Sequence, residues 1–356
     1  MSLRKIAHFV REEVLELNAY HVPDASNLIK LDNMENPYGW EPSVVDEWLQ
    51  KIREVPLNRY PDPEAKTLQT RLRDVMSIPA DAGLILGNGS DELIQIICMS
   101  LAKPGAAVLS VDPSFVMYKM LSKFTGMSYH SVALNDDFSL PVDTMLARIE
   151  EIQPAVIYLA YPNNPTGNLF DEDAICKVIE ASPGLVVIDE AYYAFADNSF
   201  AKYLDRYENM MVMRTVSKMG LAGLRLGYMM GNPAWINEFN KVRMPFNINA
   251  LTQVSADFAL EHVEMLDKQT KQICEDREKL FAEMSKIEGI VCYPSKANFI
   301  LFKVENAVGV YQSLQEKGVL IRNLSSNGGS LTDCLRVTIG AEYENEAFIK
   351  ALQESL

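Results

Sequence analysis

The 356-residue sequence is poor in the side chains that build disulfide frameworks or transition-metal sites. Its five cysteines are odd in number, lie far apart and include no C-x-x-C pair, which indicates reduced thiols. Only four histidines are present, and none is spaced to share a metal with another on one helix face. We therefore expect neither disulfides nor a metal site.

Positive charge and long apolar runs are also scarce. The chain has 33 lysines and arginines against 48 aspartates and glutamates, and its net charge of -15 opposes binding to nucleic acid. No apolar run approaches the roughly 20 residues that cross a bilayer. The first residues, "MSLRKIAHFVREEVLELNAY", interrupt their apolar side chains with charges, unlike a signal peptide. The sequence predicts a soluble, cytoplasmic protein without a nucleic acid or membrane partner.

Short apolar runs are present in number, and helical patterns separate most of them. The runs begin at Leu84, Ala107, Ala155, Leu185, Met210 and Leu226. Apolar strands that alternate with helices are typical of a mostly parallel sheet covered on both faces. After Asn247 come a long charged helical stretch and three more strand-like runs, "ANFILFKV", "GVLIRNL" and "CLRVTIG". We therefore expect a helical arm (1–30), a large α/β domain (31–247) and a smaller α+β domain (248–356).

A glycine turn, "GNGS", joins the first of these runs to a helix that begins near Ser90 and Asp91. Free N–H groups and the positive end of the helix dipole at such a turn suit a phosphate group. The turn has neither P-loop nor G-x-G-x-x-G spacing, so it does not indicate a nucleotide. The alternative is a plain helix cap made by Ser90.

Two loops that follow predicted strands carry polar side chains at the sheet edge where α/β folds place their sites. In "AYPNNPTGN", two prolines stiffen the backbone around Asn164 and so orient its amide, unless this is a simple turn. In "LVVIDEAYYAF", Asp189 ends an apolar strand, where a buried carboxylate requires a partner such as a cationic ligand nitrogen. The alternative for Asp189 is a helix cap.

The loop "SKMGLAGLRLGY" follows another strand and brings together Ser217, Lys218 and Arg225. A lysine that attacks a carbonyl carbon must be reachable, partly desolvated and near cationic groups that lower its pKa. Lys218 fits that description, although by itself it also fits a solvated surface charge.

Several other residues are compatible with the same site. Asn36 and Tyr60 each precede a proline, and Phe115 stands just past a strand, where it can stack on a flat ring or belong to the core. Arg322 and Arg336 lie in strands of the smaller domain. An arginine inside an apolar strand is costly unless it meets an anion or lies at an exposed edge.

In this order, the motifs resemble those of the fold type I pyridoxal-phosphate aminotransferases over nearly the whole chain. The resemblance implies an α/β fold with a mostly parallel seven-stranded sheet between helices, a smaller α+β domain and pyridoxal 5'-phosphate as cofactor. More narrowly, the sequence is similar to the histidinol-phosphate aminotransferase family. This implies the conversion of L-histidinol phosphate and 2-oxoglutarate to imidazole acetol phosphate and L-glutamate, in histidine biosynthesis. The motifs that carry the narrower resemblance are "ENPYG", "NRYPDP", "GNGSDE", "YPNNPTGN", "IDEAYYAF", "SKMGLAGLRLGY", "VLIRN" and "LRVTIG".

The resemblance also implies a role for each candidate residue. Lys218 would attach the cofactor covalently and act as the proton-transfer group, and Asp189 would pair with the ring nitrogen. Asn164 and Tyr192 would hydrogen-bond the phenolic oxygen of the ring, and Phe115 would stack on its face. The residues that would hold the cofactor phosphate are Ser90, Asp91, Ser217 and Arg225.

The resemblance implies an obligate homodimer with shared active sites, because Tyr60 would reach the cofactor phosphate of the neighbouring subunit. Arg336 would bind the α-carboxylate of glutamate. Arg322 and Tyr20 would recognise the substrate phosphate, and Asn36 would also bind the substrate. The same motifs leave three alternatives open: a threonine-phosphate decarboxylase, an aromatic amino acid aminotransferase and a catalytically idle cofactor-binding module.

Overall fold

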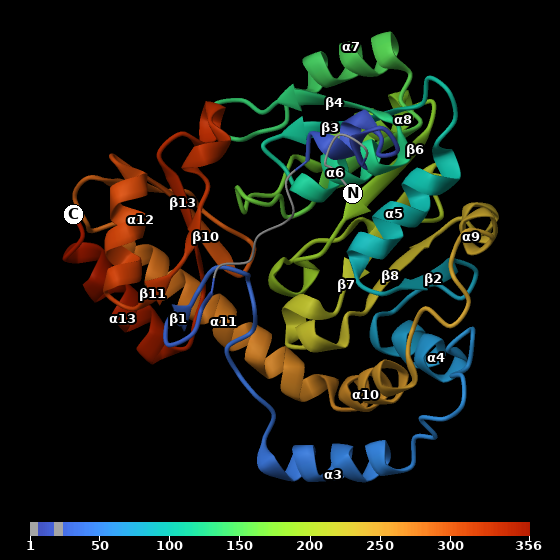
Figure 1. The fold of residues 1–356 in the computed structure, drawn as a ribbon, viewed down its shortest axis with the longest axis horizontal. Helices are drawn as coiled ribbons and strands as arrows, with labels where there is room; N and C mark the ends of the chain where they lie inside the picture. Colours follow the sequence, from blue (N-terminus) through green and yellow to red (C-terminus); the bar gives the residue numbers. More distant parts are fainter. Residues whose placement is uncertain (1–5, 18–23) are drawn as a thin grey trace.

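The computed structural model describes residues 6–17 and 24–356, and a seven-stranded mixed sheet forms its centre (Figure 1). The strand order is β2-β8-β7-β6-β5-β3-β4, and only β8 runs antiparallel to its neighbours. The mostly parallel α/β sheet expected from the sequence is therefore confirmed. Its strands are β2 (Gly83–Gly87), β3 (Ala107–Asp112), β4 (Ser128–Ala133), β5 (Val156–Ala160), β6 (Leu185–Asp189), β7 (Met210–Thr215) and β8 (Gly227–Gly231).

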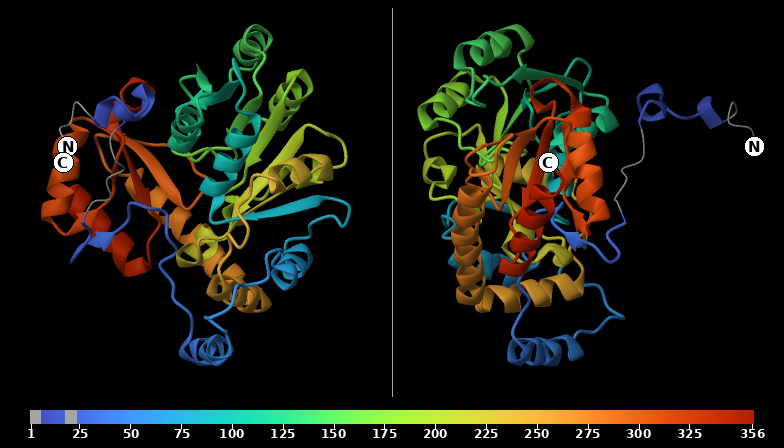
Figure 2. Two further views of the ribbon diagram at one scale, coloured as in Figure 1. Left: turned by 45° about the vertical axis from the view of Figure 1, so that its right-hand side comes forward. Right: turned by 90° about the vertical axis from the view of Figure 1, so that its left-hand side faces the viewer.

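Helices cover both faces of this sheet, as the fully buried central strands require (Figure 2). Successive side chains of a strand point to opposite faces. In β5, Tyr158 therefore joins the core on one face, while Ile157 and Leu159 join the core on the other. The first core is built with α5 (Ser90–Leu101), α6 (Val116–Thr125) and α9 (Pro233–Asn240), and the second with α4 (Lys66–Val75), α7 (Val142–Ile152), α8 (Glu172–Ala181) and α10 (Ala250–Glu261).

Side-chain caps fix where several of these helices begin. The Asp171 carboxylate accepts a hydrogen bond from the Ala174 N–H at 2.9 Å and starts α8. Asn232 caps α9 ahead of Pro233, and Asn249 caps α10. The N-terminus of α5 differs, because Gly89 stands at the cap position and no side chain bonds the first N–H groups.

A second layer of structure lies beside the large sheet (Figure 1). Its four-stranded antiparallel sheet has the order β12-β13-β10-β9, and β1 pairs in parallel with β11. Tyr192 and Phe195, which follow β6, share the core of this layer. Its elements are β1 (Ile29–Lys30), β9 (Ile290–Cys292), β10 (Phe299–Val304), β11 (Val319–Leu320), β12 (Arg322–Asn323), β13 (Cys334–Thr338), α11 (Val263–Met284), α12 (Ala307–Glu316) and α13 (Glu342–Gln353).

Several contacts join segments that are far apart in the sequence. Helix α10 packs on α4 and on α3 (Pro42–Arg53), while β1 pairs within the second layer. The division of the chain near residue 248 stays a prediction. In the arm, α2 (Glu12–Leu15) contacts α6, and the Arg11 guanidinium donates to the Phe124 carbonyl oxygen. Within the described ranges, no helix combines the length and apolar character that crossing a membrane requires.

Candidate active site

A cavity opens where three strands of the large sheet end. Ala160, Asp189 and Thr215 are the last residues of β5, β6 and β7, and all three line it. The cavity holds about 580 Å³ of space, including the part open to solvent. The structure brings together these sequence-predicted residues in its wall: Ser90, Asp91, Phe115, Asn164, Asp189, Tyr192, Ser217, Lys218 and Arg225.

Lys218 stands in a short 3-10 turn, Ser217–Met219, directly after β7. Its Nζ donates to the Asn33 carbonyl oxygen at 3.0 Å and lies 5.8 Å from the centre of the Tyr192 ring. Burial lowers the pKa of Lys218 to about 8, and the nearby Arg336 charge contributes to that shift. About a tenth of the amine is therefore neutral, and so nucleophilic, at pH 7, far more than for an ordinary lysine.

Asp189, at the end of β6, is a buried carboxylate. Its side chain is 3% exposed, Oδ2 accepts the Tyr118 hydroxyl at 2.6 Å, and Oδ1 accepts the Ala191 N–H at 3.1 Å. Among residues 6–17 and 24–356, no lysine, arginine or histidine forms an ion pair with it. Burial raises the pKa of Asp189 to about 6, although the Tyr118 and Ala191 hydrogen bonds oppose that shift. The site thus holds a carboxylate that a cationic ligand nitrogen would stabilise.

Part of the cavity wall forms an anion cradle. The first N–H groups of α5, at Ser90 and Asp91, have no side-chain cap. The Arg225 guanidinium lies beside them, with Nη2 3.3 Å from Asp91 Oδ2 and Nη1 3.5 Å from Ser217 Oγ. Backbone N–H groups, a hydroxyl and a guanidinium in this arrangement suit a phosphate.

Two glycines make room for this cradle. At Gly89, which has a φ of +83°, a Cβ would lie 2.5 Å from Arg225 Nη2. At Gly227, a Cβ would lie 2.5 Å from the Ser90 backbone nitrogen. A side chain at either position would therefore displace the groups that line the cradle.

On the side facing the second layer, Asn164, Tyr192 and Arg336 form a hydrogen-bonded chain. Asn164 Nδ2 donates to the Tyr192 hydroxyl oxygen at 3.2 Å, and Arg336 Nη1 donates to Asn164 Oδ1 at 2.5 Å. Arg336 also donates to the Asp32 carbonyl oxygen at 3.1 Å. Burial raises the pKa of Tyr192, so its hydroxyl keeps its proton. No acceptor for that proton is found in the part of the chain that the structure describes, so the hydroxyl can donate to a ligand oxygen.

Phe115 forms part of the wall of the cavity, at the N-terminus of α6. Its ring meets the Tyr118 ring edge to face, with centroids 5.6 Å apart and an interplanar angle of 85°. A partly buried aromatic ring beside Asp189 can stack on a flat ligand.

Besides Arg336, which reaches the cavity wall only through Asn164, four predicted residues are not among those that line the cavity. Tyr60 is 82% exposed and stacks on Phe246, with ring centroids 4.5 Å apart. The Asn36 amide donates to the Met219 carbonyl oxygen at 3.1 Å and to Gln269, so it braces the loop after Lys218. The other two are Arg322, which faces Arg336 across the β12–β13 pairing, and Tyr20, which lies outside the described residues.

Sequence reasoning missed three groups that touch the predicted residues. The Asn33 carbonyl holds Lys218, Thr215 Oγ1 lies 2.8 Å from Ser217 Oγ, and Tyr118 donates to Asp189. Only Tyr118 carried a usable signal, because it follows Phe115 by three residues and so shares its side of a helix. The contacts of the Asn33 carbonyl and of the Thr215 hydroxyl cannot be predicted from residue type.

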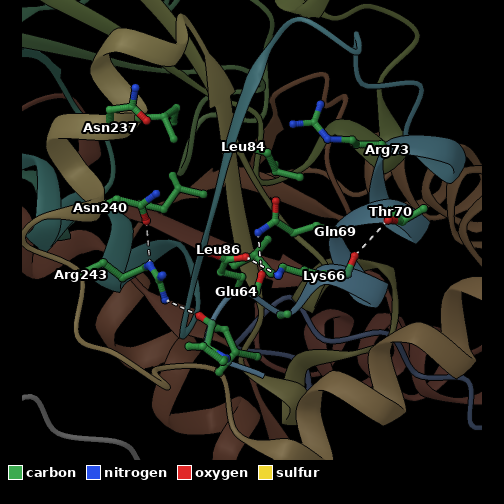
Figure 3. A pocket seen from close by; sticks show the side chains of 15 residues that line it. Glu64, Lys66, Gln69, Thr70, Arg73, Leu84, Leu86, Asn237, Asn240 and Arg243 are labelled. Carbon is green, nitrogen blue, oxygen red and sulfur yellow. Dashed lines mark hydrogen bonds and ion pairs between the residues drawn. The ribbon is translucent and has the colours of Figure 1, made fainter. Parts of the chain in front are cut away.

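A second pocket lies between α4, β2 and α9, away from these residues (Figure 3). Its cationic side chains already have partners: Arg243 donates to Asn240 at 2.9 Å, and Arg73 donates to the carbonyls of Pro79 and Ala82. Lys66 pairs with Glu64 at 3.1 Å. None of the side chains predicted to react lines this pocket. Across the described ranges, no group of three or more histidine, cysteine or acidic side chains could hold a metal ion.

Comparison with known proteins agrees with the geometry of the first cavity. The sequence model of the family described as "Aminotransferase class I and II" matches residues 26–352. A curated relative from Nitrosococcus oceani, named "Histidinol-phosphate aminotransferase 2", is 53% identical over 355 residues, which cover 99% of each chain.

Two solved structures share the fold at low sequence identity. The histidinol-phosphate aminotransferase of Sinorhizobium meliloti, in complex with pyridoxal-5'-phosphate, aligns with a TM-score of 0.87 at 24% identity, covering 98% of this chain and 97% of that one. The L-threonine-O-3-phosphate decarboxylase of Porphyromonas gingivalis aligns with a TM-score of 0.77 at 22% identity, covering 91% and 98%. The fold alone therefore does not separate these two reactions. With nearly its whole length matched by the family model, the chain belongs to the class I and II aminotransferases.

Proposed function

We propose that the chain is a histidinol-phosphate aminotransferase of histidine biosynthesis, which transfers the amino group of L-histidinol phosphate to 2-oxoglutarate. Aminotransferases of its family use pyridoxal 5'-phosphate. The substrate rests on 53% identity, over nearly the full length of both chains, to a protein named for that activity. The chemistry rests on one structural observation, namely that Lys218 and the unpaired carboxylate of Asp189 line one cavity.

The groups in the cavity fit a phosphorylated pyridine aldehyde. Asp189 is 3% exposed and lacks a cation, which a protonated ring nitrogen would supply. Tyr192 has a hydroxyl proton available for a phenolic oxygen, and Lys218 has an amine that can react with an aldehyde. The uncapped N–H groups of α5, with Ser217 and Arg225, would hold the phosphate. When bound, the cofactor supplies an electron sink for the charge that develops at the substrate Cα.

Lys218 is the group that would move protons. In its neutral form the amine can take the proton from the substrate Cα and later return it. Two features favour that form, since Lys218 is partly buried and the Arg336 charge lies nearby. Its hydrogen bond to the Asn33 carbonyl oxygen holds Nζ at 3.0 Å and so limits the positions that the amine can take.

Asn164 and Tyr192 would orient the cofactor through its phenolic oxygen. The Tyr192 ring packs edge to face against Phe299, with centroids 5.2 Å apart, which fixes the direction of the hydroxyl. Asn164 Oδ1 is held by Arg336, which fixes the amide. Both residues are less than a tenth exposed, so water is largely excluded around them.

Arg336 would bind the α-carboxylate of glutamate, and Arg322 with Tyr20 would recognise the substrate phosphate. The planar guanidinium of Arg336 suits a carboxylate, and its side chain reaches the cavity wall through Asn164. One site must accept a phosphate-bearing amino alcohol and also a dicarboxylate, and separate arginines for the two anions meet that need. Asn36 is a further substrate-binding candidate, and its hydrogen bond to the Met219 carbonyl oxygen braces the loop after Lys218.

The active unit would be a homodimer in the cytoplasm. Tyr60 is expected at the cofactor phosphate, yet it lies on the surface of its own chain and does not line the cavity. A neighbouring subunit that contributes its Tyr60 would supply the missing contact.

The test is a half-reaction followed by absorbance. Mixing the cofactor-loaded protein with histidinol phosphate, without 2-oxoglutarate, should remove the visible absorbance of the covalently attached cofactor. Adding 2-oxoglutarate should restore it and release glutamate. Lys218→Ala is the matched control, because it should keep the fold but lose both the visible absorbance and turnover. A protein that instead releases carbon dioxide from threonine phosphate, and does not respond to histidinol phosphate, would be a decarboxylase.

A further inference from the structure

Tyr118 contacts Asp189 but does not line the cavity, and the proposed function gives it no role. Tyr118, in the first turn of α6, is fully buried, and its hydroxyl donates to Asp189 Oδ2 at 2.6 Å. The Ala191 N–H holds the other oxygen at 3.1 Å. The two donors, one on each oxygen, fix the plane of the carboxylate and leave its remaining lone pairs for a ligand in the cavity.

The surroundings of Tyr118 keep its hydroxyl in place. Its ring stacks on the ring of Tyr158, with centroids 4.7 Å apart and an interplanar angle of 7°. On another side it meets the edge of Phe115. Both tyrosines are fully buried, so Tyr118 cannot turn away to water. One turn of α6 therefore supports the aromatic wall of the cavity and also the carboxylate behind it.

We propose that Tyr118 is a positioning residue, whose hydrogen bond keeps Asp189 ionised and aimed at the cationic ring nitrogen of the cofactor. This inference rests on the proposed use of pyridoxal phosphate. A hydrogen bond to a buried charged group is stronger than one between neutral groups. Its loss therefore leaves the buried charge less stabilised. Without the Tyr118 hydroxyl, the carboxylate would more readily take up a proton and pair less well with a cation.

The other charged and titratable groups around Asp189 do not replace this donor. Asp91 from α5 and Glu190 beside it both raise the pKa of Asp189, because they are like charges. Tyr192 donates nothing to it, and the Tyr158 hydroxyl has Cys98 Sγ as its neighbour, at 3.7 Å. Within the described chain, Tyr118 is thus the one side chain that donates to Asp189.

The structure offers a matched pair of substitutions. Tyr118→Phe removes the hydroxyl that touches Asp189 and keeps the buried ring. Tyr158→Phe removes the hydroxyl of the ring stacked on it, which does not touch Asp189. Both variants lose one buried hydroxyl in the same core, so a merely structural effect should be similar in the two.

The experiment measures pyridoxal phosphate affinity and the pH dependence of stability in the apoprotein. Tyr118→Phe should weaken cofactor binding about tenfold or more, and Tyr158→Phe should weaken it less than about threefold. In the apoprotein, the pH at which Asp189 ionises should move upward by about one unit in Tyr118→Phe alone. In an Asp189→Asn background the effect of Tyr118→Phe on affinity should vanish, because the charge that it serves is gone.

Equal effects of the two substitutions, or an unshifted pH profile in Tyr118→Phe, would overturn the role of Tyr118. If the wild-type protein failed to bind pyridoxal phosphate at all, the proposed function would fall. The apoprotein titration would still report whether Tyr118 controls Asp189.

Discussion

At the scale of single residues, the site depends on two ionisable groups whose burial is costly. Asp189 is buried without a cation, and Lys218 is partly buried beside Arg336. The sequence predicted that Asp189 needs a partner but not what surrounds it. The sequence could not do so because Tyr118 and the Ala191 N–H reach the carboxylate only after α6 and β6 have packed together.

Replacing Asp189 by asparagine should change how apoprotein stability depends on pH. Folding raises the pKa of Asp189 from about 4 to about 6, so protonated Asp189 favours the folded state, and this contribution is lost as pH rises through 6. The asparagine side chain cannot ionise, so the stability advantage of the variant over wild type should grow by about 2 to 3 kcal/mol between pH 4 and pH 8. Urea unfolding of both apoproteins across this range measures the difference.

Asp143→Asn is the control for that measurement, because Asp143 is exposed and its replacement should give a curve parallel to wild type. Parallel curves for Asp189→Asn as well would mean that burial does not perturb this carboxyl. Saturating pyridoxal phosphate should remove the advantage of the variant, since Asp189 then meets a cation.

Arg336 should matter unequally for the two substrates. Arg336→Ala removes the guanidinium expected to bind the α-carboxylate of glutamate, so kcat/KM for the glutamate half-reaction should fall about 100-fold or more. The half-reaction of histidinol phosphate, which has no carboxylate, should fall much less. Arg336→Lys keeps the charge without the planar fork and should lie between the two. Equal losses for both substrates would point instead to its contact with Asn164.

At the scale of elements, the strands that carry the site were predictable, and those away from it were less so. The runs at Leu84, Ala107, Ala155, Leu185, Met210 and Leu226 all became strands of the large sheet, because each is a short, continuous apolar run bounded by turns. Among the strands that were missed, β4 and β9 each pair on one side only. Both strands are partly exposed; β4 mixes polar and apolar side chains, and β9 has only three residues, so neither shows a pattern that distinguishes it from a loop.

Adjacent acidic residues at the end of β6 show a further limit of sequence reasoning. Asp189 faces the cavity, whereas the Glu190 carboxylate accepts from Arg214 at 2.9 Å and from the Phe200 N–H. Consecutive residues of an extended chain point to opposite sides, and Glu190 points to the side where Arg214 of β7 reaches it. Which one meets an arginine depends on β7 lying beside β6, and this follows from sheet order alone.

Breaking this pair should destabilise the link between β6 and β7. Both side chains are nearly inaccessible to solvent, at 6% exposure for Arg214 and 0% for Glu190. Glu190→Gln would leave the Arg214 charge buried, and the free energy of unfolding should fall by about 3 to 5 kcal/mol. Glu238→Gln, in the exposed pair with Lys241, is the control and should leave stability unchanged. Urea unfolding within about 1 kcal/mol of wild type for Glu190→Gln, as expected of a surface pair, would mean that Arg214 finds another partner.

At the scale of the whole molecule, contacts between distant segments complete the site. Lys218 bonds the carbonyl of Asn33, 185 positions away, and Arg336 reaches Asn164 from the second layer. The order of the motifs predicted that these side chains belong to one site. It could not predict that the backbone oxygens of Asn33 and Asp32 would accept hydrogen bonds from Lys218 and Arg336, because residue type does not show which carbonyl a distant side chain will use.

Tyr60 is a predicted site residue that lies on the surface of its own chain, outside the cavity. It is 82% exposed and stacked on Phe246, and it does not line the cavity. If a homodimer shares its sites, each cavity combines Lys218 of one subunit with Tyr60 of the other. Two variants that are each inactive should then complement one another in a mixed dimer.

The test co-expresses Lys218→Ala and Tyr60→Ala chains with different tags and isolates the mixed dimer. One of its sites carries both substitutions, while the other joins an intact Lys218 to an intact Tyr60 from the partner chain. Activity should therefore return to about half of the wild-type value per dimer, although each parent dimer is far less active. The control is a dimer in which both chains carry Lys218→Ala and each chain carries one of the two tags. If Tyr60 instead serves the site of its own chain, no site in the mixed dimer is whole. Its activity would then stay at the mean of the two parents, and the shared site would be ruled out.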